Sequence, residues 1–198
     1  MQSLAFTPFG EKKLANPTIG DVVTWMCRLA WNGKNDTRIR NLAEVIVRPL
    51  QSGDYTGEVG AVYCWMLQHF RYVLDPRGQE FTRWPQGQFE SIFPGSSQQR
   101  MQEDCDGQSV FSAALLQSIG HKCYFALAGF DGTGVPSHVF TVVDARGKGL
   151  LTVDAVAGSS TPKMLGEMTS CNLVDCENAV DVPFTMSAPF KGWHGWRP

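Results

Sequence analysis

Residues 104–120 read Asp-Cys-Asp-Gly-Gln-Ser-Val-Phe-Ser-Ala-Ala-Leu-Leu-Gln-Ser-Ile-Gly, and this stretch decides the fold class. Asp104 or Asp106 can cap the start of a helix, and Gly120 is a suitable residue to end one. Apolar residues between them occupy nearly every side, which is typical of a helix surrounded by other elements. We therefore expect a buried central helix with Cys105 at its N-terminal end.

The segments on either side of this helix differ in kind. Upstream, apolar residues at helical spacing predict three helices, at residues 19–31, 36–47 and 58–70. Downstream, short apolar runs bounded by turn residues predict three strands, at residues 122–128, 138–143 and 150–153. This order indicates an α+β fold with N-terminal helices and a central helix packed on an antiparallel sheet. Residues 75–103 lack periodicity, so we expect a long surface loop there.

Composition is that of one globular domain. The chain has 198 residues, of which 43% are apolar and 18% charged, and its net charge is -2. No basic stripe suggests nucleic-acid binding, and no apolar run is long enough for a spanning helix. We see no secretory signal in the first residues and expect synthesis in the cytoplasm. The expected division is an extended arm at 1–17, a domain at 18–182 and an extended tail at 183–198.

The six cysteines predict reduced thiols rather than a disulfide framework. Cys27, Cys64 and Cys123 lie in apolar runs, where a free cysteine behaves as a small apolar residue. Cys171 and Cys176, with His194 further on, do not complete a four-ligand zinc set. We expect no metal site and interpret both as loop cysteines.

Cys105 is the candidate nucleophile. Unpaired N–H groups and the helix dipole favour an anion at the start of a helix, and a thiolate is the reactive form of cysteine. The flanking aspartates oppose this effect unless they cap the helix or face outward. We expect a nearby imidazole to complete the activation of the thiol.

His138 and Asp154 are the candidate base and orienting residue. His138 begins one predicted strand and Asp154 closes the next, and residues 144–149 between them have a turn composition. A hairpin centred at residue 146 sets the two side chains opposite each other on one face, with Cβ atoms roughly 4.5–5.5 Å apart. The carboxylate can then hold the imidazole, which predicts a Cys105–His138–Asp154 triad.

An oxyanion donor is needed beside the Cys105 backbone N–H. The candidates are Gln98, Gln99, Gln102 and the indole N–H of Trp84, and the sequence does not choose among them. His121 is expected to cap a helix or to be solvated, and His69 to be structural.

These segments resemble the motifs of the transglutaminase-like superfamily. Glu103-Asp104-Cys105-Asp106-Gly107 leading into residues 113–120 resembles its nucleophile helix. Ser137-His138-Val139-Phe140 resembles its histidine strand, and Thr152-Val153-Asp154-Ala155 its aspartate strand. Residues 70–76 are similar to the segment that precedes the cysteine loop in bacterial and phage members. Members often carry Asp or Glu where Gly107 stands, so the chain departs from the pattern there.

The resemblance implies a papain-like fold and thiol chemistry on amide bonds: proteolysis, amidase action or acyl transfer to an amine. It implies a protein or peptide substrate and neither a metal nor an organic cofactor. The alternative is a phage virion structural or assembly protein that retains the fold without essential catalysis. In that case the terminal arms would contact other virion subunits, and the protein would be virion-associated.

Overall fold

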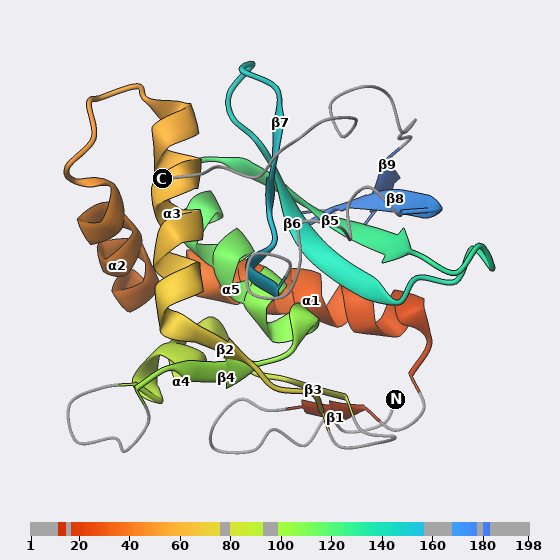
Figure 1. Ribbon diagram of the computed structural model, residues 1–198. Coiled ribbons are helices and arrows are strands. Elements are labelled where there is room, and N and C mark those ends of the chain that lie inside the picture. Colours follow the sequence, from red (N-terminus) through yellow and green to blue (C-terminus); the bar gives the residue numbers. More distant parts are fainter. Residues whose placement is uncertain are drawn as a thin grey trace.

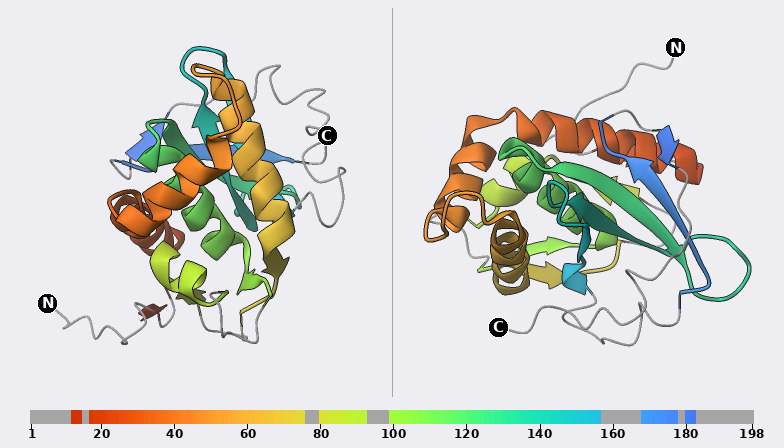
Figure 2. Two further views of the ribbon diagram at one scale, coloured as in Figure 1. Left: turned by 90° about the vertical axis from the view of Figure 1, so that its left-hand side faces the viewer. Right: turned by 90° about the horizontal axis from the view of Figure 1, so that it is seen from above.

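The computed structural model describes residues 12–14, 17–75, 80–92, 99–156, 168–177 and 180–182. Helices gather on one side of the molecule and a sheet lies on the other, with one helix, α5 (Cys105–Ser118), between them (Figure 1). The views at right angles show the same two-layer arrangement (Figure 2). The expected α+β class, with a central helix on an antiparallel sheet, is confirmed.

Helix α5 is the centre of the core. Asp104 caps it, because its side chain accepts hydrogen bonds from the backbone N–H groups of Asp106 and Gly107. Every residue from Gly107 to Gln117 is buried. The helix packs against α1, α2 and α3 on one side and against β5 and β6 on the other. The nearly all-round apolar pattern therefore corresponds to contacts on every side.

Three helices precede it: α1 (Ile19–Lys34), α2 (Thr37–Val47) and α3 (Tyr55–His69). Each begins at a side-chain cap, supplied by Thr18, Asp36 and Asp54 respectively. Thr18 forms a capping box with Asp21, in which each side chain bonds the backbone N–H of the other. The helices expected from apolar spacing are therefore present, and α1 and α3 are each a few residues longer or shifted.

The main sheet has five strands in the order β7-β6-β5-β8-β9, all paired antiparallel. The strands are β5 (Lys122–Gly129), β6 (His138–Asp144), β7 (Leu150–Val153), β8 (Ser170–Asp175) and β9 (Val180–Val182). The face that bears Phe125, Val139 and Val143 joins the core around α5. The other face carries a second apolar cluster that includes Ala126, Phe140 and Leu173. The sheet is thus buried by apolar contacts on both faces.

The expectation of a long loop at 75–103 is wrong. Within it lie β3 (Glu80–Thr82), α4 (Pro85–Glu90) and β4 (Met101–Glu103). β3 pairs with β1 (Lys12–Leu14), and β4 pairs in parallel with β2 (Phe70–Tyr72). Elements of three to six residues are too short to show a helical or alternating period, which is why the sequence did not reveal them.

Side chains of segment 80–103 also bind the backbone around the start of α5. Arg83 forms an ion pair of 2.8 Å with buried Glu103 and donates to the Gln102 carbonyl. The side-chain amide of Gln88 donates to the carbonyls of Arg83 and Gly107. The residues just before and after Cys105 are therefore held from two sides.

One smaller expectation is corrected, and another holds in part. Cys171 lies within β8 and Cys176 directly after it, and both are buried, on opposite sides of the sheet, in the second cluster and the main core respectively. They are therefore structural and do not converge. His121 follows the end of α5, where its backbone N–H donates to the Leu116 carbonyl at 3.0 Å, so the expected cap is present. Its side chain is not solvated: it is buried, and its Nε2 lies 2.7 Å from Glu58 Oε2.

The expected tail at 183–198, which includes His194, lies outside the described residues, as does most of the arm at 1–17. None of the helices in the described part of the chain has the length and apolar character that a bilayer crossing requires.

Gly33 lies where α1 closely approaches both α4 and α5. A Cβ atom at Gly33 would lie 2.6 Å from Pro85 Cγ and 2.7 Å from Ala114 Cβ. We predict that Gly33→Ala lowers the free energy of unfolding by about 1–3 kcal/mol through overpacking. Gly20→Ala, on the same helix, has only Thr18 at 3.8 Å and should change it by less than about 1 kcal/mol. Urea unfolding of both variants measures the difference, and equal losses would contradict the packing argument.

Candidate active site

Cys105 begins α5 and is half-buried at the mouth of a pocket. Its turn is attached to β6 by Ser109, whose hydroxyl lies 2.7 Å from the Cys105 carbonyl and 3.2 Å from that of Val139. One turn further along, the hydroxyls of Ser112 and Thr141 lie 2.8 Å apart, and Thr141 donates to the Ser109 carbonyl. These buried bonds set the position of the thiol relative to the strand that begins at His138.

His138 and Asp154 are joined by a hydrogen bond of 2.9 Å between Nε2 and Oδ2. Both side chains are almost fully buried. A carboxylate only accepts, so Nε2 carries the proton and Nδ1 is the basic nitrogen. The Asp154 carboxylate is itself held by the backbone N–H of Val156, at 3.2 Å. The imidazole is thereby fixed in one tautomer and orientation.

The expected register of this hairpin is wrong by a small amount. Thr141 pairs with Val153 and Asp144 with Leu150, so the hairpin is centred on Gly147 rather than on residue 146. Asp154 follows the end of β7 and is a diagonal neighbour of His138, not its direct partner. The offset is two residues along one strand, and an even offset keeps both side chains on one face. The contact therefore survives the change of register.

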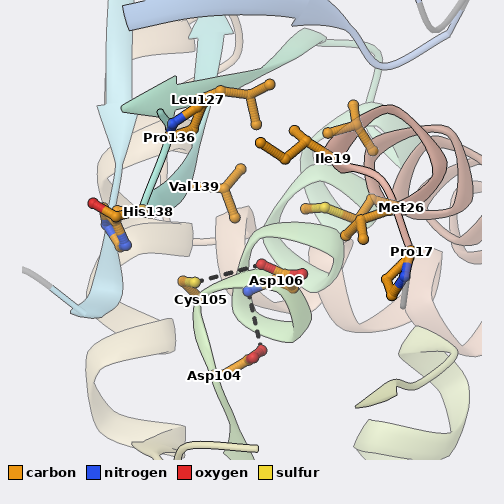
Figure 3. A pocket seen from close by; sticks show the side chains of 13 residues that line it. Pro17, Ile19, Met26, Asp104, Cys105, Asp106, Leu127, Pro136, His138 and Val139 are labelled. Atoms are coloured by element: carbon orange, nitrogen blue, oxygen red, sulfur yellow. Dashed lines mark hydrogen bonds between the residues drawn. The ribbon is translucent and has the colours of Figure 1, made fainter. Parts of the chain in front are cut away.

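The pocket has a volume of about 300 Å³. Cys105 and His138 lie at one end of it, and apolar residues from α1, β5 and β6 line the opposite wall (Figure 3). Asp106 lies between Cys105 and the side of the pocket formed by Met26 and Pro17 in that view. The thirteen lining residues are Pro17, Ile19, Val22, Val23, Met26, Asp104, Cys105, Asp106, Leu127, Pro136, Ser137, His138 and Val139.

The surroundings of Cys105 oppose the low pKa that a helix start favours. Burial, followed by the charges of Asp106 and Asp104, raises the pKa of Cys105, although the backbone N–H of Val139 lowers it. Asp106 does not face outward, because its Oδ1 accepts a hydrogen bond from the thiol at 3.4 Å. Burial and the two carboxyl groups thus oppose the thiolate that a helix start favours, and the activation of Cys105 by an imidazole stays a prediction.

The surroundings of Cys105 are acidic on the side away from His138. Burial, followed by the charge of Asp106, raises the pKa of Asp104 to about 8. Burial also raises the pKa of Asp75, and burial together with the charges of Cys105 and Asp104 raises that of Tyr72 to about 12. The sequence reasoning missed Tyr72 and Asp75, because only the parallel pairing of β2 with β4 brings this segment beside Cys105.

Gly107 has a local explanation. A Cβ atom there would lie 2.3 Å from Glu103 Oε2 and 2.9 Å from Glu103 Cβ. Glu103 occupies the space that a side chain at 107 would need, and it is anchored by Arg83. Where members of the resembled family often carry an acidic residue, this chain has Gly107, and the acidic side chain of Glu103 fills the adjacent space.

The oxyanion candidates do not line the pocket. Gln99 is exposed and Gln102 lies half-buried in β4. Trp84 directly precedes α4 and packs against the main core. Gln98 lies outside the described residues. The backbone N–H groups of Asp106 and Gly107 are bonded to Asp104 and are not free for an oxyanion.

Asp104, Cys105 and Asp106 could also supply three metal-ligand atoms within 4.8 Å of one another. The set combines two hard carboxylates with one soft sulfur, which is not a preferred combination for any common metal. It is better understood as the charged part of the pocket.

The raised pKa of Asp104 has a consequence for stability. A carboxyl with a higher pKa in the folded than in the unfolded state binds more protons when folded, so stability is present at low pH and is lost as pH rises from about 4 toward 8. We predict that Asp104→Asn, which keeps a good N-cap, is more stable than wild type at pH 8 by on the order of 1 kcal/mol. The difference should shrink toward pH 4. Urea unfolding across this range measures it, and a pH-independent difference would contradict the assignment.

Asp106 should restrain the thiol. We predict that Asp106→Asn lowers the pKa of Cys105 and increases its alkylation by iodoacetamide at pH 7, by about tenfold or more, because one nearby negative charge is removed. Glu44→Gln, which removes an exposed charge on α2, is the matched control and should leave the rate unchanged. Mass spectrometry identifies the labelled cysteine. An unchanged rate in Asp106→Asn would show that its charge does not act on the thiol.

Comparison with known proteins shows the fold. No protein-family model matches the chain, and no curated protein matches its sequence. A solved structure from Parabacteroides distasonis ATCC 8503, named a "putative protease", matches with a TM-score of 0.57 and 9% identity. The match covers 82% of this chain and 30% of that one, so the chain spans under a third of that neighbour's length. At this level of identity the likeness establishes a shared fold.

Proposed function

We propose that the chain is a cysteine-dependent hydrolase or acyltransferase acting on amide bonds, with Cys105 as nucleophile, His138 as general base and Asp154 as its orienting residue. The observation that carries the proposal is the 2.9 Å bond from His138 Nε2 to Asp154. It leaves Nδ1 as the nitrogen that can take a proton, in a pocket that Cys105 also lines. The fold shared with a protein named a "putative protease" is consistent with this activity.

The raised pKa of Cys105 favours proton transfer during attack rather than a preformed ion pair. The thiol proton passes to His138 Nδ1 as sulfur bonds to the carbonyl carbon, and Asp154 stabilises the imidazolium that forms. The tetrahedral intermediate then collapses, and the leaving amine takes the proton from His138. Water or a second amine attacks the thioester, gives a proton to His138, and Cys105 recovers its thiol when the acyl group departs.

Membership of the transglutaminase-like superfamily is part of the proposal. The candidate nucleophile begins the central helix, the histidine begins β6, and the aspartate follows β7, which is the family's order of motifs. The substrate would be a protein or peptide, and no step above requires a metal or organic cofactor.

Acylation of Cys105 by an activated ester tests the roles. We predict that His138→Gln slows acylation by about 100-fold or more, because the base is lost while a donor to Asp154 remains. Asp154→Asn should slow it less, since it removes orientation of the base and not the base itself. Mass spectrometry follows the acyl adduct, and circular dichroism confirms that each variant is folded.

Cys105→Ala is the control and should form no adduct. Equal acylation rates in wild type and His138→Gln would exclude the triad. If no activated ester acylates folded wild-type protein at Cys105, the alternative gains support: a virion structural or assembly protein that retains the fold without catalysis.

A further inference from the structure

The acidic side of the pocket is not required by the proposed triad. Asp104 is explained in part as the cap of α5, but Asp106 forms no cap and points from Cys105 toward the pocket (Figure 3). Its Oδ1 lies 3.4 Å from the Cys105 sulfur. A carboxylate here opposes thiolate formation, so we looked for a function of Asp106 other than activation of the thiol.

The Asp106 carboxyl has no lysine or arginine partner within the described part of the site. None of the thirteen lining residues is Lys or Arg. In the described part of the chain, no ion pair joins Asp104 or Asp106 to a lysine or arginine. Burial, helped by the charge of Asp75, raises the pKa of Asp106, whereas the hydrogen bond from Cys105 and the charge of His138 lower it. Asp104 is the other acidic group beside it, and of these neighbours only His138 can carry a positive charge. A partly buried carboxylate of this kind is stabilised by a cation that a ligand brings.

The distance from sulfur to carboxylate limits where that cation can be. The carbonyl carbon of a bound acyl group must lie next to the Cys105 sulfur. In an aminoacyl group the α-nitrogen is about 2.5 Å from that carbon, as bond lengths and the backbone angle require. An α-ammonium therefore falls within reach of a carboxylate oxygen 3.4 Å from the sulfur. The ammonium of a lysine side chain, four carbons further away, would pass beyond it.

The apolar wall of the pocket could hold the side chain of the bound aminoacyl residue. Beyond Asp106 the pocket is lined by Met26, Ile19 and Val23 from α1 and by Leu127 and Val139 from the sheet. A volume of about 300 Å³ accommodates one medium or large apolar side chain.

We propose that Asp106 is a specificity residue that binds the free α-ammonium group of an N-terminal apolar residue, so that the enzyme acts on the first residue of an unblocked peptide. This inference rests on the proposed function, because it assumes that Cys105 attacks the carbonyl of that residue. The bound ammonium also offsets the carboxylate charge next to the thiol. Substrate binding thereby makes proton transfer from Cys105 to His138 easier, which restricts reactivity to unblocked substrates.

A pair of affinity labels tests the inference without knowledge of the natural substrate. Leucine chloromethyl ketone has a free α-ammonium at pH 6, and N-acetyl-leucine chloromethyl ketone has the same side chain without the charge. In both, the Cys105 sulfur bonds to the methylene carbon, chloride leaves, and the thiol proton is released. Rates of Cys105 labelling are measured by mass spectrometry and divided by the rates with N-acetylcysteine, which corrects for intrinsic reactivity.

We expect wild type to prefer the free-amine label by about tenfold or more, the range of a hydrogen bond to a charged group. In Asp106→Asn the preference should fall to within about twofold, even though the thiol becomes more reactive overall. Glu44→Gln should keep the wild-type preference.

Three results would overturn the inference, and they differ in meaning. Equal labelling of wild type by both reagents leaves the proposed function standing and removes the α-ammonium site. A preference that persists in Asp106→Asn assigns the recognition to another residue. Failure of both reagents to label Cys105 in folded protein, while both label it in denatured protein, contradicts the proposed function itself.

Discussion

The attachment of the first turns of α5 to β6 is the interaction on which the rest of the site depends. Ser109 contacts the carbonyls of Cys105 and Val139, and Thr141 contacts Ser112 and the Ser109 carbonyl. These groups are buried, so each lost bond would leave a polar atom without water. The helix therefore has one position along the strand. The positions of Cys105 and His138 relative to each other follow from it.

The same burial that positions Cys105 also makes its thiolate costly. A helix start favours an anion, whereas burial, followed by the charges of Asp106 and Asp104, raises the pKa of Cys105. Asp104 has a second role as the cap of α5, although an uncharged Asn could fill that role as well. The candidate nucleophile is thus well positioned in surroundings that disfavour its charged form. In our proposals, a base held by Asp154 and a cationic ligand group beside Asp106 offset this effect.

Patterns of neighbouring residues in the sequence predicted many of the helices and strands. The spacing of apolar residues predicted α1, α2, α3 and α5, and the turn between β6 and β7 predicted a contact between His138 and Asp154. That contact tolerated a wrong register, because a shift of two residues keeps the face of a strand. The elements at 80–103 were missed, because they are short and are stabilised by contacts such as Arg83 with Glu103 rather than by their own periodicity.

By itself, the sequence determined the fold class, the burial of the central helix and the residues of the candidate triad, because apolar periodicity, capping and turn composition are local properties of the chain. Tertiary structure alone decided the charge environment. It brought Tyr72 and Asp75 beside Cys105, turned Asp106 toward the thiol, and set the apolar wall of α1 opposite His138. Desolvation and Coulomb energies depend on distances between residues far apart in sequence, and no local pattern records those distances.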